Sequence, residues 1–160
     1  MSNYQLEEKE AFTVLGVGVE LKSNYDDFAG IDKEKKAFEQ KAAAEGLFTQ
    51  LKSIAKEDNF YSVNKAYNNK MMYYFGVATD QTLDRETRNI EFPAGKYLVI
   101  KGSAANDEDL RAQLTYAAFG SALNELTDYA YVGGPNAVVI TDHKDDTYYG
   151  EILIPLVKTA

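Results

Sequence analysis

The sequence runs twice through the same order of strand-like and helix-like segments, and this repeat limits the fold more than any other feature. The first half places a strand, a helix and two strands at residues 12–21, 32–56, 61–67 and 71–79. The second half places the same elements at residues 97–102, 106–128, 137–141 and 148–157. The pattern predicts a single α+β domain, residues 1–160, built from two β-α-β-β repeats with pseudo-two-fold symmetry at residues 1–80 and 93–160. Residues 80–92 would link the repeats, and the helices would pack on one face of an antiparallel sheet.

Local signals support these boundaries. Asp32 is the predicted N-cap of the first helix, whose apolar residues recur at helical spacing, and Gly46 predicts a kink within it. Asn68-Asn69 predicts the turn between the two strands that follow. Asn106 is the predicted N-cap of the second helix, and the next three residues are acidic, which the helix dipole favours.

The second predicted helix carries apolar residues on two sides. Leu110 and Leu114 lie on one side, whereas Tyr116, Phe119 and Leu123 lie roughly opposite. A helix of this kind is either buried on both sides, or packs on the sheet with one side and borders a cleft or interface with the other. The spacing leaves both alternatives open, and we expect Tyr116 and Phe119 to face a cleft.

Composition excludes several functional classes. The chain has 17 Lys and Arg residues against 25 Asp and Glu residues, a formal net charge of −8, so we expect no direct binding of nucleic acid, which needs a basic surface. No segment approaches the roughly 20 apolar residues of a membrane span, so we expect no membrane partner. The absence of cysteine removes disulfides and thiolate sites and fits a cytoplasmic protein.

Residues that could carry catalysis or hold a metal are few. The one histidine, His143, lies beside Asp142, Asp145 and Asp146, a set that could bind a divalent ion. A solvated hairpin turn explains the same residues and is the favoured interpretation. With one histidine and no cysteine, most nucleophilic schemes lack a partner base. We therefore expect no catalytic residue, no metal and no cofactor.

One segment carries a family resemblance. Pro93 and Gly95 in Phe92-Pro93-Ala94-Gly95-Lys96-Tyr97-Leu98-Val99-Ile100 predict a turn that leads into a strand. The segment resembles the "I-P-A-G-x-Y-x-V-F" motif of the GyrI-like, or AraC-type, effector-binding domains. Further segments resemble other motifs of this family in the same order: Glu10–Gly16, Tyr73–Asp80, Tyr116–Phe119 and Glu151–Leu156. The resemblance implies a pair of β-α-β-β units with a ligand cleft where the two halves meet.

The chain departs from the family at the predicted penultimate strand. Many members carry "F-E-x-Y" there, and the glutamate supplies a counter-charge for cationic ligands. The aligned positions hold Val138 and Ile140. Because aliphatic side chains cannot offset the desolvation of a cation, we expect an apolar cleft floor and neutral aromatic ligands that bind at least as well as cationic ones. Glu151, expected to share a face with Leu153, is the nearest carboxylate that could replace the missing one.

The resemblance implies a small-molecule effector-binding module for a hydrophobic or aromatic ligand, with a role in transcription regulation or in ligand sequestration. We expect no enzymatic activity, since relatives that act as hydrolases use the glutamate that is missing here. Two alternatives are a protein-interaction inhibitor of the DNA gyrase inhibitor type, with a protein partner, and a hydrolase of reactive electrophiles. The resemblance and the helix pattern together predict eight ligand-binding residues: Tyr73, Tyr97, Tyr116, Phe119, Val138, Ile140, Glu151 and Leu153.

Overall fold

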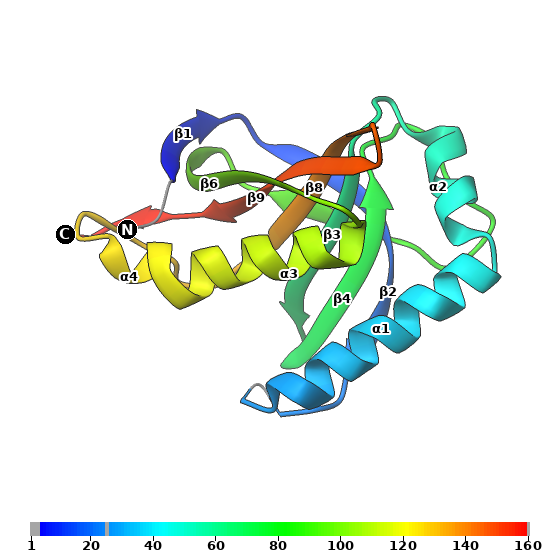
Figure 1. Cartoon of the computed structure of the whole chain (residues 1–160), viewed down its shortest axis with the longest axis horizontal. Coiled ribbons are helices and arrows are strands. Elements are labelled where there is room, and N and C mark those ends of the chain that lie inside the picture. The colour runs from blue at the N-terminus through cyan, green and yellow to red at the C-terminus, as the bar shows by residue number, and fades with distance from the viewer. Residues whose placement is uncertain (1–3, 25, 160) are drawn as a thin grey trace.

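The centre of the protein is an eight-stranded antiparallel sheet, with helices on one face (Figure 1). The computed structural model describes residues 4–24 and 26–159. The strands of the sheet are β1 (Gln5–Lys9), β2 (Phe12–Leu21), β3 (Phe60–Tyr67), β4 (Lys70–Val77), β5 (Arg88–Phe92), β6 (Gly95–Ala104), β8 (Asn136–Lys144) and β9 (Thr147–Pro155). They follow the order β1-β6-β9-β8-β3-β4-β2-β5. The predicted α+β fold class is confirmed.

The strand order is symmetric about the central β3–β8 pair. Each half contributes its first strand on the outside, its last strand in the middle and its second strand at the centre. This is the arrangement expected for two β-α-β-β repeats related by a pseudo-two-fold axis. The hairpin turns also agree with the sequence, since Asn68, Asn69, Asp145 and Asp146 all have positive φ angles.

Two short strands of the eight-stranded sheet were not predicted from the sequence. β1 precedes β2 in the chain but pairs with β6 of the second half, and β5 precedes β6 but pairs with β2 of the first half. Residues 88–92 are therefore part of the sheet and not of a linker. Because only two residues join β1 to β2, the two ends of the sheet lie close together, and the sheet curls into a half-barrel.

The inside of this curl, which we call the inner face, holds an aromatic and aliphatic cluster whose buried members all come from strands. Phe12 and Phe92 stack there with ring centroids 4.6 Å apart. Tyr97 is fully buried, and its hydroxyl donates a 2.6 Å hydrogen bond to the carbonyl of Pro93. The Pro93–Tyr97 motif thus fixes the turn from β5 into β6.

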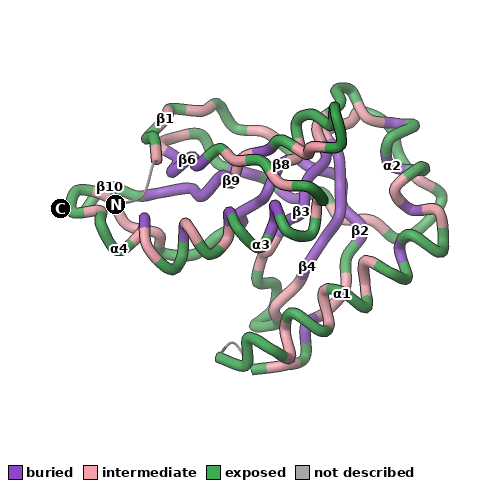
Figure 2. Tube along the Cα trace, viewed as in Figure 1, coloured by how far each residue is buried: buried purple, intermediate pink, exposed green. Residues whose placement is uncertain are grey.

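The other face of the sheet, which we call the helix face, is covered by two groups of helices. α1 (Phe28–Ala44) and α2 (Leu47–Ile54) pack over β2 and β4, and α3 (Asp107–Ala117) packs over β6, β8 and β9. Figure 2 shows the buried positions concentrated in the strands, with α1 mostly exposed or half-buried. The expected helix-on-one-face arrangement is confirmed.

The first helical segment differs from its prediction in its start and continuity. Asp27, not Asp32, is the N-cap, and its carboxylate accepts a 3.0 Å hydrogen bond from the Gly30 amide. Asp32 lies inside the helix and pairs with Lys36 at 3.4 Å. Gly46, with a φ of 76°, ends α1 and redirects the chain into α2, because the left-handed region suits a residue without a Cβ.

The second helical segment begins as predicted and then changes character. The Asn106 side chain caps α3 through a 2.7 Å hydrogen bond from the Asp109 amide. The helix continues as a π-helical turn, η1 (Ala118–Ala122), and ends with α4 (Leu123–Glu125). β7 (Tyr129–Ala130) then pairs with the final strand, β10 (Val157–Lys158).

Candidate functional site

A cavity of about 520 Å³ opens on the helix face where the two halves meet, and we call it the junction cavity. The first half contributes α2 and the segment that leads into β3, and the second half contributes the start of α3 and the β8–β9 hairpin. The lining residues are Phe48, Lys52, Ala55, Glu57, Asp58, Asn59, Phe60, Asp107, Ile140, Thr141, Asp142, His143 and Tyr148.

Aromatic side chains form much of the apolar wall. Phe48 of α2 and Phe60 of β3 lie with ring centroids 5.4 Å apart, and both also contact Phe75. In the second half's part of the lining, His143 and Tyr148 of the hairpin stack at 3.8 Å. Flat rings in a cavity wall offer contact surfaces for an aromatic ligand.

Acidic side chains dominate the polar part of the wall. Glu57, Asp58, Asp107 and Asp142 line the cavity, and Lys52 is its one lysine. With His143 neutral, the lining carries a formal charge of −3. A cleft lined by one sign of charge raises the local concentration of ligands with the opposite sign.

The local fold explains how these residues come together. The left-handed Gly46 turns α2 away from the direction of α1, and α2 brings Phe48 to the junction. The Asn106 cap places Asp107 at the first turn of α3. A register irregularity between Ile140 and Asp142 interrupts the regular pairing of β8 with β9 beside the cavity.

Three of the predicted site residues lie on the helix face, but only Ile140 lines the cavity. Val138 is buried in the cluster beneath α3. Tyr73 is buried in the cluster beneath α1 and α2, and this burial raises the pKa of its phenol. Of the two residues predicted to form an apolar floor, Ile140 therefore lines the cavity and Val138 does not.

Three other predicted site residues belong to the opposite side of the sheet. Tyr97 and Leu153 are members of the inner-face cluster. Glu151 pairs with Val139, also of that cluster, and so lies on the same side. Since side chains alternate between the two faces of a strand, Glu151 cannot replace the carboxylate missing at Val138. The expectation that all eight residues share one cleft does not match this arrangement.

Tyr116 and Phe119 lie on the outside of the second helical segment. They are 77% and 40% exposed, and Phe119 makes an edge contact with Tyr131 at 5.7 Å. Leu110 and Leu114 on the other side of α3 are buried against the sheet. The two-sided pattern is therefore explained by one side on the sheet and one toward solvent, away from the junction cavity.

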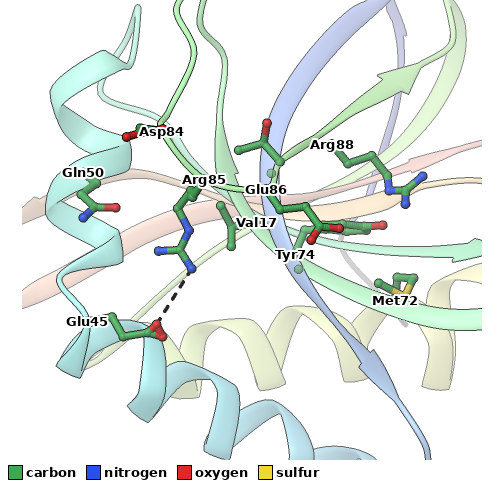
Figure 3. A pocket seen from close by; sticks show the side chains of 12 residues that line it. Val17, Glu45, Gln50, Met72, Tyr74, Asp84, Arg85, Glu86 and Arg88 are labelled. Atoms are coloured by element: carbon green, nitrogen blue, oxygen red, sulfur yellow. Dashed lines mark ion pairs between the residues drawn. The ribbon is translucent and has the colours of Figure 1, made fainter.

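A second cavity, of about 480 Å³, lies within the first half and its connection to the second (Figure 3). Gly16 and Gly18 of β2, the Tyr74 ring and residues 84–88 line it, and Arg85 approaches Glu45 to 3.9 Å. Its lining is predominantly polar and comes from one repeat and the segment after it. The junction cavity is the one that both repeats build, and it has the aromatic walls that ligand sites favour.

Within residues 4–24 and 26–159, no group of three or more His, Cys, Asp or Glu side chains is arranged to hold a metal ion. The helices of this part of the chain include none long and apolar enough to cross a membrane.

The sequence contained signals for several cavity residues, but each had another explanation. Phe48 fitted the buried stripe of the first helix, and Asp107 fitted the acidic first turn of the second. Asp142 and His143 fitted a solvated turn. The sequence predicted each of these local features, but it did not predict that these residues meet at one cavity.

The chain belongs to the Cass2 family of integron-associated effector-binding proteins, whose family model matches residues 5–156. The predicted resemblance to effector-binding domains is thereby confirmed, and the protein is a small-molecule effector-binding module. A search of curated protein sequences finds no match.

Several solved structures share the fold. SAV2435, solved bound to tetraphenylphosphonium, has a TM-score of 0.75 and 18% identity over 97% of this chain and 94% of its own. A putative bacterial transcription regulation protein from Staphylococcus aureus MU50 has a TM-score of 0.71 and 17% identity over 98% and 99%. The integron cassette protein VCH_CASS2 from the mobile metagenome of Vibrio cholerae has a TM-score of 0.58 and 13% identity over 96% and 95%.

Proposed function

We propose that the protein binds a hydrophobic, aromatic small molecule with a positive charge in the junction cavity. The observation that carries this proposal is the combination, in one cavity between the halves, of aromatic walls with four carboxylates. The volume of about 520 Å³ falls within the roughly 300–1,000 Å³ typical of ligand pockets. Rings on the ligand would stack on Phe48, Phe60 and Tyr148, and the carboxylates would offset the loss of water around its charge.

This proposal replaces the expectation that neutral aromatic ligands bind at least as well as cationic ones. That expectation depended on Val138 and Ile140, of which only Ile140 lines the cavity. The acidic residues come from other elements, among them Glu57, Asp107 and Asp142. The tetraphenylphosphonium complex of SAV2435 supports an aromatic cation as the ligand class.

We further propose that binding occurs without catalysis. The position of the family's glutamate holds Val138, buried beneath α3, so that group is not available as an acid or base. A role in transcription would require a separate partner that contacts DNA, because the net charge of −8 opposes direct binding. The open cavity favours a ligand over the alternative of a protein-interaction inhibitor.

Calorimetric titration with methyltriphenylphosphonium and with triphenylphosphine oxide tests this function. The two compounds have similar shape and differ in charge, and we expect the cation to bind more tightly. Thr141→Trp should abolish binding of both compounds by filling the cavity from β8, where an aromatic residue suits a strand. Thr147→Trp, in the same hairpin but outside the cavity lining, is the matched control and should bind normally. Equal binding by both Trp variants would place the ligand elsewhere.

A further inference from the structure

Arg111 of α3 connects the two halves beside the junction cavity. Its Nη2 lies 2.5 Å from Oε1 of Glu39 in α1, and its Nη1 lies 3.3 Å from Oδ2 of Asp107. The arginine is buried, whereas the two carboxylates are half-buried. We call these three residues the Arg111 network.

This network shares a carboxylate with the cavity. Asp107 lines the cavity and also accepts a hydrogen bond from Arg111, one helical turn further along α3. A cation in the cavity and the Arg111 guanidinium would therefore compete for the same negative charge.

The network also shares the aromatic wall. The Arg111 guanidinium carbon lies 5.7 Å from the centroid of the Phe75 ring. Phe75 in turn contacts Phe48 at 5.0 Å and Phe60 at 6.0 Å, and both of these rings line the cavity. Carboxylates and an aromatic ring are the surroundings that would stabilise a bound aromatic cation, and the Arg111 guanidinium already occupies such surroundings.

We propose that Arg111 is an internal counter-cation of the junction cavity that limits the affinity for positively charged ligands and so sets the ligand charge that the protein prefers. This inference rests on the proposed function. The Arg111 charge offsets Asp107 and Glu39 in the empty protein and repels a second cation nearby. Without it, two half-buried carboxylates would lack their partner, and a ligand cation could neutralise them.

A second basic side chain reports on the same environment. Lys35 Nζ lies 4.7 Å from the centroid of the Tyr73 ring, which contacts Phe75. Burial lowers the pKa of Lys35 to about 8, with Asp32 opposing this shift and Arg111 adding to it. The main cause of this shift is burial, and the Arg111 charge makes a smaller contribution in the same direction.

The test compares Arg111→Met with Lys36→Met. Lys36 also bridges α1 and α3, through Asp32 at 3.4 Å and Glu108 at 3.3 Å, but it is half-exposed and does not line the cavity. Both variants remove one positive charge and keep an unbranched side chain. Calorimetric titration at pH 7 with methyltriphenylphosphonium and triphenylphosphine oxide gives the ratio of the two affinities. We expect Arg111→Met to increase this ratio in favour of the cation by about tenfold, and Lys36→Met to leave it unchanged.

A second variant should change the affinity ratio in favour of the neutral compound. Glu39→Gln removes a carboxylate but keeps Arg111, so less negative charge neutralises the guanidinium. We expect this variant to weaken binding of the cation about threefold relative to triphenylphosphine oxide. If circular dichroism shows that Arg111→Met does not fold, Glu39→Gln tests the inference by itself. An affinity ratio equal to that of the unmodified protein would then overturn the inference.

The outcomes separate the inference from the proposed function. If the unmodified protein binds the cation and Arg111→Met leaves the affinity ratio unchanged, the inference fails and the proposed function stands. If Arg111→Met binds both compounds more tightly by the same factor, Arg111 acts only by filling space, and this result would also overturn the inference. If only Arg111→Met binds the cation, Arg111 does oppose cations as inferred, but the proposed function of the unmodified protein is overturned. Failure of both proteins to bind either compound would overturn both proposals.

Discussion

On the inner face of the curled sheet, Phe12 and Phe92 stack at 4.6 Å, with Phe92 enclosed by other strand residues. On the helix face, Phe48 and Phe60 meet at 5.4 Å but border a cavity of about 520 Å³. The two pairs are chemically alike. They differ because the sheet curls around the first pair, whereas two separate helical layers leave a space beside the second.

The difference assigns separate roles to the two faces. The inner face stabilises the fold, and its tyrosine motif at Pro93–Tyr97 holds a turn. The helix face provides the surface where the repeats meet and where a ligand can enter. Substitutions on the inner face should therefore change stability without changing the affinity of folded molecules, and substitutions around the cavity should change affinity.

The largest effect is expected for Phe92→Ala. Removing this fully buried ring should lower the free energy of unfolding by about 3–5 kcal/mol, because lost transfer energy and a residual cavity add together. Phe28→Ala removes a ring that is 78% exposed and should cost less than about 0.5 kcal/mol. Urea unfolding measures both. A loss below about 1 kcal/mol for Phe92→Ala would contradict the closed inner face.

Gly46→Ala tests the bend that positions α2. A Cβ at a φ of 76° should cost about 1–2 kcal/mol, and Gly46→Asn should cost less because asparagine enters the left-handed region more readily. Both variants should also weaken ligand binding, since α2 carries part of the cavity wall. Thermal unfolding and calorimetry provide the two measurements. Equal costs for Ala and Asn would argue against backbone strain as the cause.

Tyr97→Phe removes the hydroxyl that bonds to Pro93 and should cost about 1 kcal/mol at pH 7, with no change in ligand affinity. Burial raises the pKa of Tyr97 to about 12, whereas an unfolded tyrosine titrates near 10. The unfolded chain therefore loses this proton first, and the stability contributed by Tyr97 is lost as pH rises from about 10 through 12.

The pH dependence has an internal control. Other buried tyrosines, such as Tyr61 and Tyr73, stay present in both proteins, so the difference between unmodified protein and Tyr97→Phe isolates Tyr97. Chemical denaturation at several pH values between 9 and 12 should show the two stabilities converging. A constant difference across this range would mean that Tyr97 ionises as it does in the unfolded chain.

The smallest effect is expected for Asp142→Asn. Removing one cavity carboxylate should weaken binding of methyltriphenylphosphonium about threefold, which corresponds to roughly 0.6 kcal/mol, and leave triphenylphosphine oxide unchanged. Asp146→Asn removes the same charge from the tip of the same hairpin, where asparagine tolerates the positive φ, and serves as the control. The same loss in both variants would indicate a long-range effect of net charge.

Much of the fold could be predicted from the sequence, because its signals are local. Alternation and β-branched residues defined the strand at Phe12–Leu21, and the Asn106 cap defined the start of α3. The first helix began earlier than predicted, since Asp27 offered an equally good cap. β1 and β5 were not predicted, because short edge strands show little periodicity in the sequence. Their pairing with the opposite half also depends on how the sheet curls.

The candidate site was less accessible to prediction. Tyr97, Leu153 and Val138 all carried family motifs or apolar character, and all three are buried by packing. An apolar residue looks the same in sequence whether it faces a closed cluster or an open cavity.

The sequence by itself determined the repeated β-α-β-β order, the acidic balance and the membership of an effector-binding family, because local spacing, composition and short motifs carry these properties. Only the tertiary structure decided which face of each strand is enclosed and which borders the junction cavity. It also decided that Asp107 and Arg111 of α3 come together with Glu39 of α1 and Asp142 of β8, since these residues lie on three separate elements. Their convergence depends on the curled sheet and on the packing of two helical layers, which arise from contacts between residues distant in the chain.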